Sequence, residues 1–388
     1  MFYAAVGSVL IWVGLLLFRA GFWRADQVLD DNPQDVGRWP SIATIIPARN
    51  EADTIQRVLA AHAKSDYPGQ YSVIVVDDHS DDATAALAEK VKAEANRPVY
   101  VISAPDLQPG WSGKLWALNA GLDRLEDLVP DCRYVLLTDA DILHPPETAR
   151  ALMAKAIDDD LDLVSLMALL DCRGGWARLL VPAFVFFFQK LYPFPMVNDA
   201  TSRQAGAAGG CVLLRRDALA RIGGISAIRE ALIDDCALAA AVKGNPPRNR
   251  IWLGLSRSVR SLRDNSDLGS IRTMVERTAF TQLRHSTLLL AGCLAGMALT
   301  YLAGPVALVW GLLSASPVTA GAGAIAWLLS ALAYWPTLRL YGQPISWALT
   351  LPAAASMYSM MTLSSALKHW RGKGGHWKGR TYSDLARS

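Results

Sequence analysis

The sequence predicts an α/β fold, in which a domain with a mainly parallel β-sheet is joined to an all-α block of transmembrane segments. Between residues 41 and 285, short apolar runs alternate with helical patterns, which is typical of βαβ units. Between residues 286 and 367, by contrast, Arg339 is the only charged residue. The 388 residues are 52% hydrophobic and 19% charged, which excludes a disordered or fibrous protein.

The first 25 residues are predicted to form an N-terminal membrane anchor. Residues 2–18 carry no charge, and Arg19 and Arg24 follow on the side expected to face the cytoplasm. A cleaved signal peptide is disfavoured, because no basic segment precedes the apolar run. A buried core helix is the alternative for so short a run. Residues 26–40 are polar and contain proline, so they are predicted to be a linker.

Strands and helices are then predicted in alternation, because β-branched runs give way to segments with helical spacing. In chain order, these are the strand Ile42–Ile46, which ends at Pro47, the helix Glu51–Lys64, the strand Ser72–Val76, the helix Asp82–Ala95, the strand Val99–Ile102, the helix Lys114–Leu125, and the strands Tyr134–Thr138, Leu163–Leu166 and Cys211–Leu214. Ligands of such sheets bind beyond the carboxyl ends of the strands, so polar residues at these ends are the candidate site.

Three segments of residues 286–367 could each cross a bilayer of about 30 Å, which needs roughly 20 residues. They are Thr287–Leu313, Val318–Leu338 and Ile345–Leu367. Three spans would place the basic tail, residues 368–388, away from a cytoplasmic catalytic domain and against the positive-inside tendency. A break at Gly304-Pro305 would make one segment re-entrant, so the count stays open. Residues 182–195 are too short to span, and an interfacial helix and a core helix are both compatible with them.

Charge and cysteine content exclude two further classes of protein. Residues 41–285 carry a net charge of −2 and no basic stripe, which argues against a nucleic-acid partner. The five cysteines show no CxxC spacing, so a zinc site or a disulfide framework is not expected. Free cysteines suit a domain that faces the reducing cytoplasm. The basic tail suits an anionic membrane surface.

Paired carboxylates follow two of the predicted strands. Asp139 and Asp141 flank Ala140 directly after Tyr134–Thr138. Two carboxylates at this spacing can share Mg²⁺ or Mn²⁺, which prefers oxygen ligands and keeps places for diphosphate oxygens. The same pattern also occurs in solvated turns. Asp77 and Asp78 follow Ser72–Val76 and could accept hydrogen bonds from a ribose or a base.

Other polar residues of these loops have ordinary structural alternatives. Ser80 or Asp81 could cap the next helix. Glu51 lies where a nucleotide ribose would be expected, or it complements the dipole of its helix. Gly113 and Lys114 open a helix whose N-terminus favours an anion. The glycine spacing of a Walker A loop is absent there.

A last pair of carboxylates, Asp234 and Asp235, lies further along the chain. Paired carboxylates raise each other's pKa, which suits a general base, although a polar helix start is the alternative. Gly209 and Gly210 precede a strand and allow close approach to a ligand. The polar clusters described so far follow one another along a single domain, most of them next to predicted strands. Surface turns of unrelated sequence rarely give such an order.

In this order, the motifs resemble those of the family 2 glycosyltransferases, which have the nucleotide-sugar-binding GT-A fold. The resemblance covers about residues 40–285 and rests on IIPARNE, VVDDHSDDAT, GKLWALNAG, DAD, AGGCVLLRRDAL and IDDCAL. It implies that Glu51 and Asp78 hold the nucleoside of a UDP-sugar, supported by Asp77. It also implies that Asp139 and Asp141 hold the metal on the diphosphate.

The same resemblance assigns further roles. Lys114 would lie near the diphosphate or the donor sugar, and Asp235 would deprotonate the acceptor hydroxyl. Asp234 stands where the family usually has Glu, so its catalytic role is less defined. The remaining donor-binding residues expected from these motifs are Pro47, Arg49, Gly113, Asn119, Ala140 and Gly210.

The acceptor is also suggested by resemblance. Processive members carry QxxRW, whereas this chain has Thr281-Gln282-Leu283-Arg284-His285, closer to the ceramide glucosyltransferases. A single, inverting sugar transfer is therefore expected, with Arg284 either contacting diphosphate or anchoring the chain at the membrane. The segments FVFFFQKLYPF, NDATSRQAGAAGG and WKGRTY make the whole chain similar to hopene-associated glycosyltransferases of bacteria. Arg380 in that tail would reach the active site, or the tail would bind anionic lipid.

This resemblance implies an inner-membrane enzyme with a cytoplasmic catalytic domain, and a hopanoid hydroxyl as its lipid acceptor. Transfer to a polyprenyl phosphate is one alternative. A membrane scaffold that merely binds nucleotide is another, but the carboxylates at every catalytic position argue against it.

Overall fold

The computed structural model describes residues 1–245, 250–372, 376–377 and 380–381 of the chain. These residues fall into two compact units. The sheet unit comprises Gln27–Leu170, Met196–Arg263 and His376–Ser388, and the helical unit comprises Met1–Asp26, Asp171–Pro195 and Asp264–Gly375. Residues 171–195 and 264–285, which the sequence places in the catalytic segment, are thus grouped with the helical unit.

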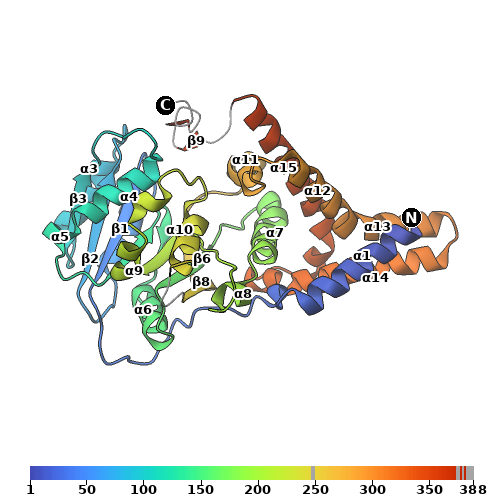
Figure 1. Ribbon diagram of the computed structural model, residues 1–388, viewed down its shortest axis with the longest axis horizontal. Coiled ribbons are helices and arrows are strands. Elements are labelled where there is room, and N and C mark those ends of the chain that lie inside the picture. The colour runs from blue at the N-terminus through green and yellow to red at the C-terminus, as the bar shows by residue number, and fades with distance from the viewer. Residues whose placement is uncertain (246–249, 373–375, 378–379, 382–388) are drawn as a thin grey trace. The chain divides into compact units, whose positions relative to one another are not determined.

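The sheet unit is built on one eight-stranded sheet in the order β3-β2-β1-β4-β7-β6-β8-β5 (Figure 1). Strands β3, β2, β1 and β4 are parallel, and so are β6 and β8, whereas β7 and β5 run antiparallel to their neighbours. The α/β class is therefore confirmed, with a parallel core and a mixed edge. The strands are β1 (Ile42–Ala48), β2 (Tyr71–Asp77), β3 (Val99–Ser103), β4 (Tyr134–Thr138), β5 (Ile142–Leu143), β6 (Leu163–Leu169), β7 (Cys211–Arg215) and β8 (Ile251–Ser261).

Every residue of β1, β2 and β4 is buried, because helices and loops cover both faces of a parallel sheet. The helices and 3₁₀ turn of this unit are α2 (Ile55–Ala63), α3 (Thr84–Glu94), α4 (Gly113–Asp123), α5 (Leu125–Leu128), α6 (Thr148–Asp158), α9 (Arg216–Arg221), η2 (Ile225–Ile228) and α10 (Asp234–Lys243). Helix α4 lies especially close to the sheet. A Cβ on its Gly121 would come within 2.6 Å of Ile45 Cγ2, so only glycine allows this approach.

Some predicted boundaries are wrong for local reasons. Strand β1 continues through Pro47 to Ala48. Helix α2 begins at Ile55 rather than Glu51, because the intervening residues form a turn in which Thr54 N donates to Glu51 O at 3.0 Å. Helix α6 and strand β8 were not predicted. Strand β8 alternates serine and arginine at its end, so its apolar run is short in the sequence.

The helical unit contains the apolar helices of the chain. Its elements are α1 (Phe2–Phe18), η1 (Phe22–Arg24), α7 (Gly175–Leu191), α11 (Leu268–Gln282), α12 (Thr287–Met297), η3 (Ala298–Leu302), α13 (Ala303–Leu313), α14 (Pro317–Leu340), η4 (Ile345–Thr350) and α15 (Leu351–Trp370). The short helix α8 (Phe194–Asn198) follows α7. Among the described residues, two helices are long and apolar enough to cross a membrane, Thr287–Leu313 and Pro317–Leu340.

The third predicted span does not form one long apolar helix. Its residues are divided between η4 and α15, and α15 ends in polar contacts with α11. Ser365 Oγ donates to Glu276 O at 2.6 Å, and Lys368 forms an ion pair with the Glu276 carboxylate. Helix α7 contains most of the aromatic residues between 182 and 195. It packs against α14, α15 and α11, and Tyr358 Oη donates to the Leu180 carbonyl of α7 at 2.9 Å.

Gly304-Pro305 does not break the first span. Instead, the helix widens into the π-helical segment η3 just before these residues. The Thr300 carbonyl oxygen of that segment accepts hydrogen bonds from Trp12 Nε1 at 2.8 Å and from Ser8 Oγ at 3.1 Å. Helix α1 thus supplies partners for a backbone group of the irregular turn.

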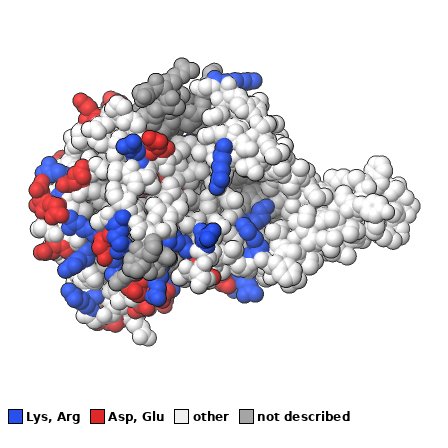
Figure 2. Space-filling view, in the orientation of Figure 1, with Lys and Arg blue, Asp and Glu red and all other residues white. Residues whose placement is uncertain are grey.

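Helices α13 and α14 pack in close contact through glycines. A Cβ on Gly323 would overlap the backbone nitrogen of Leu308 and lie 2.6 Å from Gly304 O. Close backbone approach through small residues is typical of helix pairs in membranes. Figure 2 shows that the surface over α1, α13 and α14 is almost free of charged side chains in this view.

Replacing Gly323 with valine should therefore destabilise the helical unit. We expect Gly323→Val to lower the free energy of unfolding by about 1–3 kcal/mol or more, because the new side chain meets backbone that cannot move aside. Gly321→Val is the matched control, since nothing lies within 4 Å of a Cβ at that position of the same helix. Thermal unfolding of both full-length variants in detergent measures the difference. Equal melting temperatures would show that α13 and α14 do not pack this closely.

Candidate active site

The candidate site lies where the parallel strands end. Strands β1 and β2 are in register up to Ala48 and Asp77, and β4 pairs with the other side of β1. The segments after these strands therefore emerge at the same edge of the sheet, which is the ligand-binding edge of α/β folds. They carry Glu51, Asp78 and Asp139, three of the residues that the sequence singles out.

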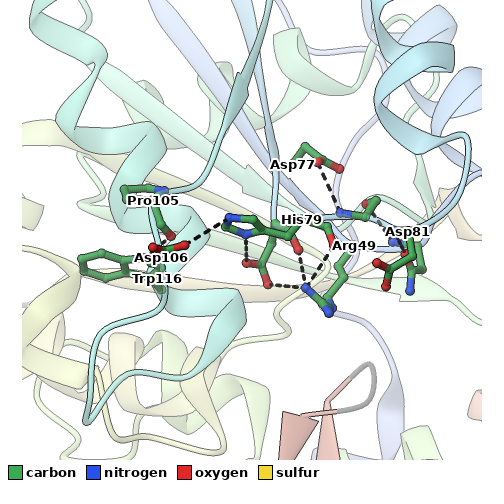
Figure 3. Close-up of polar contacts among 10 residues, drawn as sticks. Arg49, Asp77, His79, Asp81, Pro105, Asp106 and Trp116 are labelled. Atoms are coloured by element: carbon green, nitrogen blue, oxygen red, sulfur yellow. Dashed lines mark hydrogen bonds and ion pairs between the residues drawn. The ribbon is translucent and has the colours of Figure 1, made fainter.

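Arg49 joins the segments that follow β1 and β2 (Figure 3). Its guanidinium donates to the backbone carbonyl of Asp78 and lies 3.8 Å from the Asp78 carboxylate. It also donates to His79 O at 3.3 Å. Because the Asp78 side chain is fully buried, this contact with Arg49 places a positive charge beside a carboxylate that is removed from water.

Side-chain to backbone hydrogen bonds fix the rest of these two loops. Asn50 N donates to Ser80 Oγ at 3.0 Å, and Asp81 N donates to Asn50 Oδ1 at 2.8 Å. Asp77 Oδ2 accepts from Ser80 N at 3.3 Å. The prediction that Ser80 or Asp81 caps helix α3 is therefore wrong. The N-cap position of α3 is Ala83, which has no side-chain cap hydrogen bond, and the preceding Asp82 accepts from Thr84 N at 2.9 Å through its Oδ1.

A third loop, after β3, reaches the same region and was not predicted as part of the site. His79 Nε2 lies 3.6 Å from Asp106 Oδ1, and Trp116 Nε1 donates to Pro105 O at 2.9 Å (Figure 3). The Asp106 side chain is fully exposed. A sequence signal was present, because Asp106 follows a strand just as Asp78 and Asp139 do.

The ammonium group of Lys114, in the first turn of α4, is placed among carboxylates. Its Nζ lies 2.9 Å from Asp139 Oδ1 and 3.2 Å from Asp234 Oδ2. Burial alone would lower the pKa of Lys114, but attraction to Asp139 and Asp234 outweighs it and holds that pKa above its ordinary value. Lys114 therefore carries a full positive charge and joins the loop after β4 to the start of α10.

Asp235 is held in one orientation by two backbone groups. Its Oδ2 accepts from Gly209 N at 2.8 Å, and its Oδ1 accepts from Cys236 N at 2.7 Å. Burial and the neighbouring charge of Asp234 raise the pKa of Asp235 to about 6. A carboxylate with this pKa is ionised at neutral pH, yet it is more basic than an ordinary aspartate.

A hollow surrounds this group of charges. Lys114, Asp139, Gly209, Asp234 and Asp235 line it on the polar side. Apolar side chains of β4, α4, β7, η2 and α10 line most of the remainder, namely Leu115, Leu118, Leu137, Val212, Ile225, Ile228 and Leu238. A small number of convergent polar groups on an apolar wall is typical of small-molecule sites.

The residues after β4 fit a divalent cation that is completed by substrate. Burial and the charges of Asp139 and Glu51 raise the pKa of Asp141 to about 6, which indicates a local excess of negative charge. The carboxylate oxygens of Asp139 and Asp141 are of the kind that Mg²⁺ and Mn²⁺ prefer as ligands. The described residues hold no group of three or more His, Cys, Asp or Glu side chains that could ligate a metal by themselves. Asp139 and Asp141 would therefore hold the ion together with oxygens of a bound diphosphate.

The other predicted residues are placed as follows. Pro47 lies in β1, Ala140 is buried between the two aspartates, and Gly113 begins α4. The Gly210 carbonyl accepts from Thr138 Oγ1 at 2.8 Å, which links β4 to the segment that holds Asp235.

Three residues that the sequence predicts to bind the donor, Asn119, Arg284 and Arg380, are not among the contacts described above. Asn119 Nδ2 donates to Asp123 Oδ2 at 2.9 Å, within its own helix. Arg284 lies in the helical unit, in the turn after α11. The side chain of Arg380 lies outside the part of the chain that the structure describes.

The sheet order and the charged side chains at the strand ends define an α/β domain with a polar site at the carboxyl edge of its sheet, and a solved structure shows the same architecture. The mannosyltransferase PcManGT from Pyrobaculum calidifontis, in complex with GDP-Man and Mn²⁺, superposes with a TM-score of 0.54 at 18% identity. The match covers 94% of this chain and 99% of that chain. This likeness shows the fold, GT-A with appended helices.

Residues 43–223 match the family model described as glycosyl transferase family 2. Undecaprenyl-phosphate 4-deoxy-4-formamido-L-arabinose transferase of Pseudomonas fluorescens (strain Pf0-1) is 27% identical over 177 residues, 44% of this chain and 45% of that protein. The enzyme of the same name from Klebsiella pneumoniae is 31% identical over 127 residues, 32% of this chain and 35% of that protein. The matches span less than half the length of these curated relatives.

Proposed function

We propose that this protein transfers one sugar from a UDP-sugar to a hydroxyl group of a membrane lipid, with inversion at the anomeric carbon. The observation that carries the proposal is the placement of Asp235. Its carboxylate is fixed by Gly209 N and Cys236 N beside the Lys114–Asp139 ion pair. A base with a raised pKa thus lies next to the residues proposed to hold the diphosphate and its metal.

In the proposed reaction, Asp235 accepts the proton of the lipid hydroxyl as its oxygen forms a bond to the anomeric carbon. The bond from that carbon to the UDP oxygen breaks at the same time, and UDP leaves from the opposite face. Mg²⁺ or Mn²⁺ held by Asp139 and Asp141 would offset the negative charge that develops on the leaving diphosphate. Lys114 would add a second, fixed positive charge on the same group.

Residues that shape the loops would bind the nucleoside. Glu51 and Asp78 would accept hydrogen bonds from the ribose and the base, and Arg49 would keep the Asp78 loop in place. Asp77 would support that loop through Ser80 N. Asp234 is assigned a positioning role, because it shares the Lys114 ammonium with Asp139.

The membrane arrangement we propose places the sheet unit and the basic tail on the cytoplasmic side of the bacterial inner membrane. Helix α1, a shorter apolar helix of 17 residues, would serve as the N-terminal anchor, and Thr287–Leu313 and Pro317–Leu340 would form a return pair. With α15 on the membrane surface, the tail comes back to the cytoplasmic side, as its positive charge favours. The number of spans then agrees with the positive-inside tendency.

For the acceptor, we propose a hopanoid hydroxyl, because of the sequence resemblance described above. A polyprenyl phosphate is the second candidate, and the names of the two curated relatives favour it. A phosphate acceptor is already an anion, so it would need a base far less than a hydroxyl does. The two acceptors therefore differ in how much the reaction depends on Asp235.

A transfer assay tests the reaction directly. Purified full-length protein is incubated with a panel of radiolabelled UDP-sugars and a total bacterial lipid extract, with Mn²⁺ or with EDTA. We expect label to enter an extractable lipid with Mn²⁺ and not with EDTA, because Asp139 and Asp141 need the ion to bind the diphosphate. Mass analysis of that lipid identifies sugar and acceptor. Label that stays in the aqueous phase for every donor would contradict a lipid acceptor.

Asp235→Asn separates the two acceptors. With a hydroxyl acceptor, we expect the turnover rate to fall about 100-fold or more, the usual contribution of a general base. The UDP dissociation constant should stay within about twofold, which also shows that the variant is folded. Asp217→Asn, an exposed aspartate of α9, is the control. A fall of less than about tenfold would favour a polyprenyl phosphate.

The rate should also depend on pH through Asp235. Since its pKa is raised to about 6, the carboxylate is protonated and inactive as a base below that pH. We expect the turnover rate to rise with pH through about 6 and then to level off. Asp234→Asn removes a charge that raises this pKa, so the midpoint should move to lower pH. A midpoint that is the same in both proteins would assign the profile to another group.

A further inference from the structure

The helical unit is rich in positive charge. It contains twelve Lys and Arg against five Asp and Glu, and helices α1 and α7 and residues 286–367 have no acidic residue. Cations on helices of this kind usually extend toward water at the membrane surface. The side chain of Lys190, near the end of α7, instead contacts aromatic side chains of its own unit.

The Lys190 side chain is enclosed by aromatic groups rather than extended. Its Nζ donates to Tyr301 Oη at 2.7 Å. The same atom lies 4.7 Å from the ring centre of Tyr301 and 5.5 Å from that of Phe187. Such contacts over ring faces stabilise a cation, but they supply no negative charge.

A second cation lies beside it. The guanidinium of Arg19, just after α1, donates to the carbonyl oxygen of Lys190 through Nε at 3.4 Å and Nη2 at 3.3 Å. Among the described residues, neither Lys190 nor Arg19 has a carboxylate within 4 Å, so no anion accompanies these two charges there.

This arrangement destabilises the charged form of Lys190. Burial and the charge of Arg19 lower the pKa of Lys190 to about 8, although the nearby thiol of Cys293 acts in the opposite direction. Two close cations in an apolar environment are destabilising unless an anion joins them.

The position of Tyr301 is set by the irregular helical turn η3. Tyr301 lies in this π-helical segment and is almost completely buried. Its ring packs edge-on against Trp12 and Phe187, with centres 5.4 Å and 5.5 Å apart. Single π-helical turns occur frequently at functional sites, and this one directs a hydroxyl group to Lys190.

We propose that Arg19, Lys190 and Tyr301 form a binding site for the phosphate headgroup of a membrane lipid. All three side chains can donate hydrogen bonds, and two are cations, which suits a group with several acceptor oxygens. The aromatic walls and the neighbouring apolar helices suit a phosphate attached to a hydrocarbon chain rather than a soluble nucleotide. This proposal does not rest on the proposed sugar transfer, because lipid binding here needs no donor.

Native mass spectrometry of the full-length protein in detergent tests the site without any turnover. The probes are phosphatidic acid and undecaprenyl phosphate, each paired with its uncharged counterpart, diacylglycerol and undecaprenol. We expect wild-type protein to retain the phosphate lipids in preference to their counterparts. Lys190→Gln should lower that occupancy about tenfold. Arg339→Gln, an exposed cation at the end of α14, should leave it unchanged.

The outcomes distinguish the sources of the phosphate. Equal loss for both phosphate lipids in Lys190→Gln supports a general headgroup site, and loss for undecaprenyl phosphate alone supports a site for a carrier lipid. Unchanged occupancy in Lys190→Gln, or undecaprenol binding as well as its phosphate, would overturn the proposal. If Lys190→Gln does not fold, Tyr301→Phe keeps the ring, and Arg19→Gln removes the second cation. If both Tyr301→Phe and Arg19→Gln retain the phosphate lipids as wild-type protein does, the proposal is also overturned.

Discussion

The ammonium group of Lys114 lies between carboxylates that would otherwise repel one another, and the active-site arrangement depends on it. Asp139 comes from the loop after β4, and Asp234 comes from the start of α10, almost one hundred residues later in the chain. Their shared contact with Lys114 brings together parts of the sheet unit that no backbone pairing joins directly. The same charge also limits how far the pKa of Asp235 rises.

The backbone at Gly209 and Gly210 lies beside these charged groups. A Cβ on Gly209 would be in ordinary van der Waals contact with them, 3.4 Å from both Asp235 Oδ2 and Lys114 Nζ. Thr138 Oγ1 bonds to the neighbouring Gly210 carbonyl, so the residue before Asp139 also supports the segment that orients Asp235. The loop that holds Asp139 and the proposed base Asp235 are therefore linked through the backbone, in addition to the contacts of Lys114 with Asp139 and Asp234.

The sequence was sufficient for the parallel core and for the strand-end carboxylates, because both follow from local patterns. Buried parallel strands appear as continuous apolar runs, and the polar residues that stop them mark the ligand edge. Contacts between distant segments could not be predicted in this way. The pairing of His79 with Asp106, and the contact of Ser80 with Asn50 rather than with helix α3, depend on how three loops meet. The third predicted span is divided between η4 and α15, and hydropathy could not show that Ser365 and Lys368 contact α11.

The two units differ in the sign of their net charge, and this difference suits the two ligands proposed for them. By sequence, the helical unit has a net charge of +7, and the sheet unit has a net charge of −4. An excess of carboxylates at the strand ends would favour a divalent cation, and under the proposed function a diphosphate would bind through that cation and Lys114. An excess of lysine and arginine among apolar helices favours the phosphate of a lipid instead. If both proposals hold, one chain would bind a water-soluble donor and a membrane lipid without competition between their phosphates, because each unit would attract its ligand with charges of different sign.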